Sequence, residues 1–145
     1  MSLRDYARKR SFDATPEPSW ERRTRRGRGA PIFVVQLHHA STRHFDFRLE
    51  ADGALKSWAV PKGPSLRVGE KRLAVEVEDH PLDYADFEGE IPKGQYGAGR
   101  VEIFDRGTWA CEQDPLQAIA AGKLDFVLDG DRLQGRFTLV RTGRQ

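Results

Sequence analysis

The sequence has few of the features that mark secreted and membrane proteins. Its single cysteine, Cys111, excludes an intrachain disulfide and cannot anchor a cysteine-rich zinc site. No run of apolar residues exceeds four, which excludes a transmembrane helix. The basic residues near the N-terminus are not followed by an apolar stretch, so the pattern of a secretory signal is missing. We therefore expect a soluble, cytoplasmic protein.

Hydrophobic residues are few as well, but aromatic residues are not. The chain is 38% hydrophobic and 32% charged, with a mean hydropathy of −0.66. Three tryptophans, eight phenylalanines and three tyrosines are nevertheless too many for a wholly disordered chain. At 145 residues the sequence has the length of one domain and can bury one core.

Basic side chains are concentrated near the N-terminus. The formal net charge is only +2 at pH 7, yet residues 1–30 carry a clear excess of lysine and arginine, densest at 22–28. Such an arm is a common footprint of nucleic-acid contact, because lysine and arginine displace counterions from phosphates. A poorly ordered, solubilising terminus has the same composition, so both interpretations stand. We predict a partly flexible basic arm over 1–30 and a β domain over 31–145.

Alternating apolar and polar residues predict a mainly β structure. The clearest alternation, at 44–50, places phenylalanine or leucine at every second position, and Asp52-Gly53 then favours a tight hairpin. An N-cap followed by proline at Asp114-Pro115, with Gly122 beyond, predicts one short helix at 116–121. The expected strands are 32–39, 44–50, 54–60, 72–78, 100–104, 108–112, 124–128 and 133–141.

These elements imply a compact antiparallel sandwich or barrel, and we predict a β-barrel of about seven to eight short strands. Within it, Leu73, Val75 and Val77 form the apolar face of one strand. Residues 105–107 are expected to turn the chain between the strands 100–104 and 108–112, and 79–99 to form a loop.

Three candidate ligands for a divalent metal lie in the first two strands. Alternation places His44, Asp46 and Arg48 on one side of a single strand, about 6 to 7 Å apart, and His38 can join them from the neighbouring strand. Two imidazoles and one carboxylate leave coordination positions open, as a catalytic metal requires. Arg48 adds a planar fork that suits two phosphate oxygens. The alternative is a polar strand face that only faces water, but three of the four histidines, at 38, 39 and 44, cluster here.

Several longer motifs resemble one family. The run QLHHASTRHFDFRL at 36–49 resembles the signature of the 3′-phosphoesterase domain of bacterial DNA ligase D. The segments KSWAVPKGPS at 56–65, EDHPLDY at 78–84, FEGEIP at 87–92 and YGAG at 96–99 are similar to that family too, as is the lead-in around TPEP at 15–18. The resemblance extends over nearly the whole chain.

The resemblance implies a small β-barrel whose metal-dependent activity heals the 3′ ends of DNA or RNA–DNA strands. Members of this family remove a terminal 3′-ribonucleoside as phosphodiesterases. They then remove the 3′-phosphate as phosphomonoesterases, which leaves a 3′-hydroxyl for extension or sealing. They favour manganese, so Mn2+ is the expected cofactor.

The resemblance also implies roles for single residues. The metal ligands would be His38, His44 and Asp46, and the catalytic residues would be His80, Arg48, Tyr84, Glu17 and Gln36. Among these, Arg48 and His80 would hold the scissile phosphate, and His80 would either protonate the leaving oxygen or stabilise charge. His39 stands where relatives carry an acidic or other polar residue, which adds a stray candidate ligand.

The expected partners are 3′ ends of DNA or RNA–DNA primer–templates in strand-break repair, with a ligase and a polymerase acting in trans and no membrane. Relatives are expected to continue beyond Gln145 into one more apolar strand. Without that strand, the barrel would have an open edge. The alternative function is a non-catalytic module on the same barrel that binds nucleic-acid ends. Acting on DNA would place the protein at the nucleoid.

Overall fold

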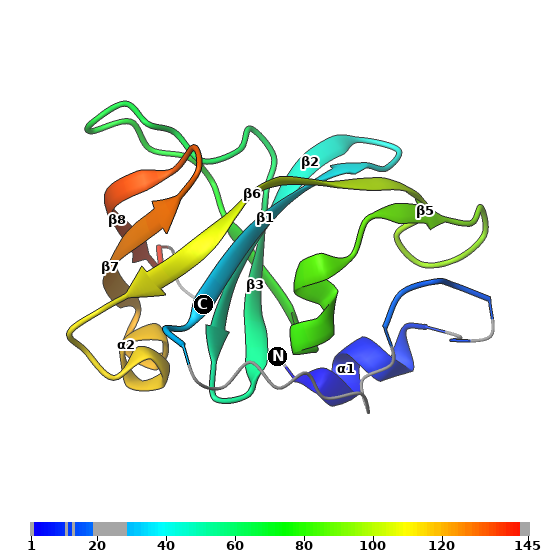
Figure 1. Cartoon of the computed structure of the whole chain (residues 1–145), viewed down its shortest axis with the longest axis horizontal. Coiled ribbons are helices and arrows are strands. Elements are labelled where there is room, and N and C mark those ends of the chain that lie inside the picture. The colour runs from blue at the N-terminus through cyan, green and yellow to red at the C-terminus, as the bar shows by residue number, and fades with distance from the viewer. Residues whose placement is uncertain (1, 11, 13, 19–28, 143–145) are drawn as a thin grey trace.

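One curled antiparallel sheet forms the body of the molecule (Figure 1). The computed structural model describes residues 2–10, 12, 14–18 and 29–142. The strands are β1 (Ile32–His39), β2 (Arg43–Ala51), β3 (Ala54–Val60), β4 (Val75–His80), β5 (Gly89–Ile91), β6 (Gly99–Ala110), β7 (Lys123–Gly130) and β8 (Gln134–Val140). Their order is β4-β3-β2-β1-β6-β7-β8, with β5 paired to β6. The structure thus confirms a mainly β, antiparallel fold, curled as a half-barrel.

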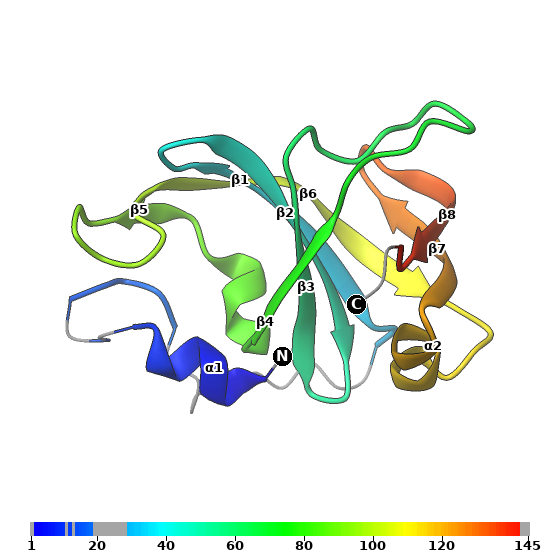
Figure 2. The same ribbon diagram turned by 180° about the vertical axis from the view of Figure 1, so that it is seen from behind.

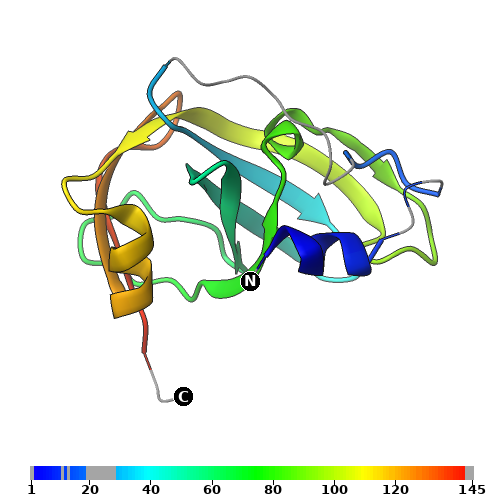
Figure 3. The same cartoon turned by 90° about the horizontal axis from the view of Figure 1, so that it is seen from below.

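Helical segments cover two parts of this sheet. The α-helices are α1 (Leu3–Arg8) and α2 (Pro115–Ala121), and η1 (Leu82–Asp86) is a 3-10 helix. The predicted helix is confirmed as α2, which ends at Gly122 in the left-handed region with φ +97°. Seen from below, α1 lies at the β4 side of the sheet, where it contacts β4, and α2 lies beside β7 and β8 (Figure 3). Within the described part of the chain, no helix is long and apolar enough to cross a membrane.

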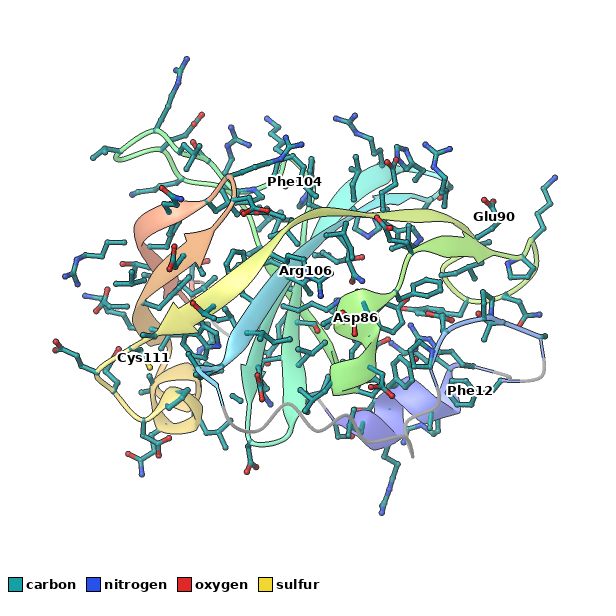
Figure 4. The ribbon with its side chains drawn as sticks, viewed as in Figure 1. Phe12, Asp86, Glu90, Phe104, Arg106 and Cys111 are labelled. Atoms are coloured by element: carbon teal, nitrogen blue, oxygen red, sulfur yellow. The ribbon has the colours of Figure 1, made fainter. Side chains whose placement is uncertain are left out.

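The sheet buries a separate apolar cluster on each face, because side chains alternate along every strand. One cluster joins β1, β2, β3, β6 and β7 and includes Phe33, Phe47, Trp58, Trp109 and Phe126. The other joins Val34 of β1 and Leu55 of β3 to Tyr6 of α1 and Tyr84 of η1. We call this second side the α1 face. An ion pair between Arg106 of β6 and Asp86 of η1, 2.5 Å long, also joins the sheet to the covering segment (Figure 4).

The predicted turn at 105–107 is wrong, because β6 runs through it as one long strand. The buried carboxylate of Asp105 accepts hydrogen bonds from the backbone N–H groups of Asp131, Arg132 and Leu133, at 2.9, 3.1 and 2.8 Å. Asp105 therefore stabilises the distant β7–β8 connection and not a turn of its own segment. Gly107 is needed for close packing, since a Cβ there would lie 2.1 Å from the Asp129 carbonyl oxygen.

The predicted strand at 72–78 begins later, as β4, and its apolar face is not in the core. Leu73 is 67% exposed and Val75 is 48% exposed, whereas Ala74 packs against the cluster on the opposite face. The reason is topological, since β4 is the last strand on its side of the sheet and has a neighbour on one side only. The region expected to be a loop, 79–99, contains η1 and β5. From behind, the β3–β4 connection projects beyond the sheet (Figure 2).

The N-terminal segment contributes to the α1 face. Tyr6 is fully buried and Glu17 is 4% exposed, so this stretch packs on the sheet. The arginine cluster at 22–28 lies outside the described residues. The division into a flexible arm over 1–30 and a domain over 31–145 therefore stays a prediction.

Candidate metal centre

Three candidate ligands converge on the α1 face. His38 of β1 lies directly opposite His44 of β2 in the ladder, and Asp46 follows on the same face of β2. One ligand atom from each residue lies within 4.8 Å of the other two. The distances are 3.1 Å from His44 Nε2 to Asp46 Oδ1 and 3.5 Å from His38 Nδ1 to Asp46 Oδ2. The arrangement predicted from strand alternation is present.

The outer side of each imidazole faces a backbone carbonyl. His38 Nε2 lies 2.7 Å from the Gly97 oxygen, and His44 Nδ1 lies 3.2 Å from the Thr42 oxygen. With a metal bound, a neutral imidazole in such a contact would carry its proton on the outer nitrogen. The inner nitrogen, which otherwise hydrogen-bonds to Asp46, would then donate an electron pair. Two such nitrogens and the Asp46 carboxylate then point at one place. Because all three are electron-pair donors, this set fits a divalent cation.

Asp46 is held in its charged form. Burial opposes ionisation, but hydrogen bonds from His38 and His44 and the positive charge of Arg48 keep the pKa of this carboxyl well below its usual range. The hydrogen bond to Asp46 raises the pKa of His44 above its ordinary value. A metal ion would therefore compete with a proton for the His44 nitrogen.

Arg48 lies next to the three ligands, and a hydrogen bond to Gln36 holds its guanidinium in place. Its Nε donates a 2.7 Å hydrogen bond to Gln36 Oε1, and its Nη2 lies 3.5 Å from Asp46 Oδ2. The Gln36 amide in turn donates to the carbonyl oxygens of Tyr84 and Phe87, at 2.8 and 3.1 Å. Both polar groups of the Gln36 amide are thus used, and they link Arg48 to η1 and the residue that follows it. This link holds the guanidinium beside the metal centre.

His80, at the end of β4, lies between two arginines. Its Nδ1 is 3.2 Å from Arg48 Nη1 and 3.0 Å from the Glu78 carbonyl oxygen, and its Nε2 is 3.5 Å from Arg10 Nη2. Burial and the positive charges of Arg48 and Arg10 lower the pKa of His80 well below its ordinary value of 6.5. His80 is therefore neutral at neutral pH in this protein.

This lowered pKa predicts a loss of stability in acid. Below the ordinary pKa of 6.5 the unfolded chain binds a proton that the folded His80 does not, so the free energy of unfolding falls as pH falls. We expect a slope of up to about 1.4 kcal/mol per pH unit below that point. Urea unfolding in chelator from pH 7 to about pH 5 measures it, and His80→Gln should flatten it. An equal slope in both proteins would contradict the prediction.

Sequence reasoning missed a buried charge cluster beside this centre. The Arg10 guanidinium donates to Glu17 Oε2 at 3.0 Å and to Glu78 Oε2 at 3.1 Å, and all three side chains are at most 5% exposed. Glu17 also accepts from the Tyr84 hydroxyl at 2.6 Å and from Thr15 Oγ1 at 3.0 Å. No local signal identifies Arg10 or Glu78, because their partnership spans 68 positions of the sequence.

The predicted site residues therefore separate into two groups. In the first group, His38, His44 and Asp46 converge, Arg48 lies beside Asp46, and His80 lies against Arg48. In the second, Gln36 contacts Arg48, Glu17 contacts Arg10, and Tyr84 contacts Glu17. Tyr84 also packs its ring 4.9 Å from the Arg48 guanidinium and 4.6 Å from the His80 ring. Among the described residues, the predicted stray ligand His39 belongs to no ligand group, and its Nε2 instead contacts Glu102 Oε2 at 2.5 Å. The catalytic roles stay predictions.

Comparison with known proteins agrees with this geometry. The family model described as the DNA ligase D 3′-phosphoesterase domain matches residues 36–141. The chain is 58% identical over 140 residues to the multifunctional non-homologous end joining protein LigD of Pseudomonas aeruginosa, covering 97% of this chain and 17% of that protein. It is 47% identical over 143 residues to the corresponding DNA repair protein of Mycobacterium tuberculosis, covering 97% and 18%.

The chain spans less than a fifth of the length of these relatives, so the likeness concerns one part of a longer protein. The matched range contains the three candidate metal ligands, Arg48 and His80. Both the match and the identity run through the strands that build the α1 face. On these grounds the chain belongs to the family of DNA ligase D 3′-phosphoesterase domains.

Proposed function

We propose that this protein is a metal-dependent phosphoesterase that heals the 3′ ends of DNA primer strands during strand-break repair. It removes a terminal 3′-ribonucleoside as a phosphodiesterase and then the remaining 3′-phosphate as a phosphomonoesterase. The observation that carries the proposal is the convergence of His38, His44 and Asp46 directly beside the anchored guanidinium of Arg48. Membership of the 3′-phosphoesterase family supports it.

The division of labour follows from the chemistry of phosphate esters. A divalent metal at His38, His44 and Asp46, with Mn2+ as the favoured ion, would neutralise charge on the phosphate and supply a nucleophile at neutral pH. Arg48 binds non-bridging oxygens of the phosphate through the edge of its fork that Gln36 does not use. Because the arginine is held before substrate arrives, it stabilises the transition state without reorganisation.

The remaining residues position these groups. Neutral His80 faces Arg48 with one nitrogen and Arg10 with the other, so it helps to hold these arginines at the phosphate and brings no resident acidic proton. Burial and the neighbouring charge of Glu17 raise the pKa of Tyr84 well above its usual range, so its hydroxyl stays protonated and donates to Glu17. Glu17 then orients Arg10, which lies against His80.

The relatives suggest the setting of this activity. Both proteins compared above are named for non-homologous end joining, and the chain matches under a fifth of each. We infer that the substrates are 3′ ends of DNA or RNA–DNA primer–templates. The product, a 3′-hydroxyl, is what a polymerase extends and a ligase seals, so these two activities are the proposed partners.

Metal removal tests the proposal. A primer–template whose labelled primer ends in one ribonucleotide is incubated with the protein and Mn2+, and in parallel with chelator. We expect stepwise loss of the ribonucleoside and then of its phosphate with metal only, because the donor set needs a cation to act on the ester. A second primer ending in 3′-phosphate isolates the monoesterase step.

Two results would contradict the proposal in different ways. Retarded but uncut primer in both lanes would favour a module that binds ends without cutting them. Equal cleavage with and without chelator would remove the metal from the mechanism while leaving the phosphoesterase activity in place.

A further inference from the structure

We propose that an apolar shelf beside the metal centre binds the terminal ribonucleoside that the phosphodiesterase step releases. The shelf consists of Ala59 on β3 and of Val75 and Val77 on β4. This inference rests on the proposed function, and it assigns a surface to one part of the substrate.

The strand register places the shelf next to the reacting groups. Asp46 of β2 pairs with Ala59, and Ala59 pairs with Val75. In the neighbouring row, Arg48 pairs with Ser57, and Ser57 pairs with Val77. Directly paired residues of antiparallel strands project from the same face of the sheet. The shelf therefore continues the surface of the metal ligand and the arginine, with Val75 about 10 Å from Asp46 across two strand spacings.

The shelf is open, although its residues are apolar. Val75 is 48% exposed, and Ala59 and Val77 are half-buried. Strand alternation gives the orientation of Val75 and Ala59, since Ala74 beside Val75 and Trp58 and Val60 beside Ala59 pack in the cluster on the opposite face. Exposed apolar side chains on the last strand of a sheet invite unwanted association. Binding of an apolar part of the substrate would cover these side chains during the reaction.

Covering segments limit where a group attached to the bound phosphate can lie on the sheet. On the β1 side, the amide of Gln36 lies under η1, bonded to the carbonyl oxygens of Tyr84 and Phe87. His38 on that side contacts the Gly97 carbonyl oxygen of the β5–β6 connection. Segments of the chain therefore cover the sheet toward β1, and α1 packs on β4 at its His80 end. Among the described residues, the surface left open beside Asp46 and Arg48 lies toward Ala59 and Val75.

The chemistry of the shelf selects the nucleoside over the primer strand. Ala59, Val75, Val77 and the intervening Ser57 carry no charge. A primer strand brings another phosphate at every step and binds where lysine and arginine line its path. The ribonucleoside beyond the scissile phosphate carries no further phosphate. Its sugar and base need apolar contact and no cation, which is what the shelf offers.

The test compares two substrates with one protein. The double variant Val75→Ala/Val77→Ala is assayed on a primer ending in a ribonucleoside and on the same primer ending in 3′-phosphate, which has no terminal nucleoside. We expect kcat/KM for the diester to fall about ten-fold through loss of apolar contact, while the monoester value changes less than about two-fold. Leu66→Ala/Val68→Ala is the matched control, since it removes two aliphatic side chains that are 62% and 104% exposed in the β3–β4 connection. It should change neither value.

A second variant tests the same surface in the opposite direction. Val75→Phe enlarges the shelf with a ring on which a base can stack, so KM for the diester should fall about five-fold with the monoester KM unchanged. Equal losses on both substrates in the double variant would place the primer strand on the shelf and overturn the inference. Unchanged diester kinetics in both variants would overturn it too. A wild-type protein inactive on both substrates would remove the proposed function itself, and this inference with it.

Discussion

Replacing His38 by alanine is expected to lower the phosphoesterase rate by more than about a hundred-fold. The substitution removes one of three converging ligands, and even the outer partners of metal ligands contribute 10- to 100-fold in many metal sites, as an order of magnitude. The Asp46 carboxylate would also lose one of the two histidine hydrogen bonds that keep its pKa low. Rates on the 3′-phosphate primer with saturating Mn2+, together with calorimetric titration of Mn2+, measure both consequences.

His39→Ala is the matched control for this variant. The two histidines are neighbours in β1, but His39 contacts Glu102 and belongs to no ligand group among the described residues. Its removal should leave the rate and the Mn2+ affinity within about two-fold of wild type, because the partly exposed contact with Glu102 is not part of the ligand group. Equal losses in both variants would mean that strand β1 as a whole, and not its metal-facing nitrogen, had been damaged.

Arg48→Lys is expected to lower kcat by about a hundred- to a thousand-fold, although the charge is kept. Removing one preorganised hydrogen-bond donor to a transition state has effects of this size. A lysine presents a point charge and cannot hold Gln36 with one edge and a phosphate with another. The Gln36 oxygen, which now accepts at 2.7 Å, would be left buried without a partner, at a cost of about 1–3 kcal/mol in folding free energy.

The contrast with Arg106→Lys isolates this effect. Arg106 also lies on the α1 face, but it pairs with Asp86 of η1 and its side chain is 47% exposed. We expect kcat and the free energy of unfolding to stay near wild type in that variant. If Arg48→Lys kept full activity with an unchanged KM, charge alone would be sufficient and the anchored fork would have no catalytic role.

Local sequence determined a large part of this protein. The alternation at 44–50 predicted that His44, Asp46 and Arg48 share a strand face, and Asp114-Pro115 with Gly122 predicted α2. These signals are reliable because strand alternation and helix capping act between residues that are close in sequence. The motif at 36–49 likewise carried the family resemblance, since it lies in one continuous stretch.

Only the tertiary structure decided how distant segments combine. The sequence Asp-Arg-Gly at 105–107 is typical of a turn. The Asp105 carboxylate nevertheless accepts hydrogen bonds from the β7–β8 connection, 26 positions or more away. Arg10 pairs with Glu78 across 68 positions, which no periodicity encodes. The apolar alternation at 73–77 indicates a strand but not which neighbour the strand has, and its place at the sheet edge leaves Leu73 and Val75 exposed. Burial and pairing depend on the packing of the whole chain, whereas propensity depends on a few consecutive residues.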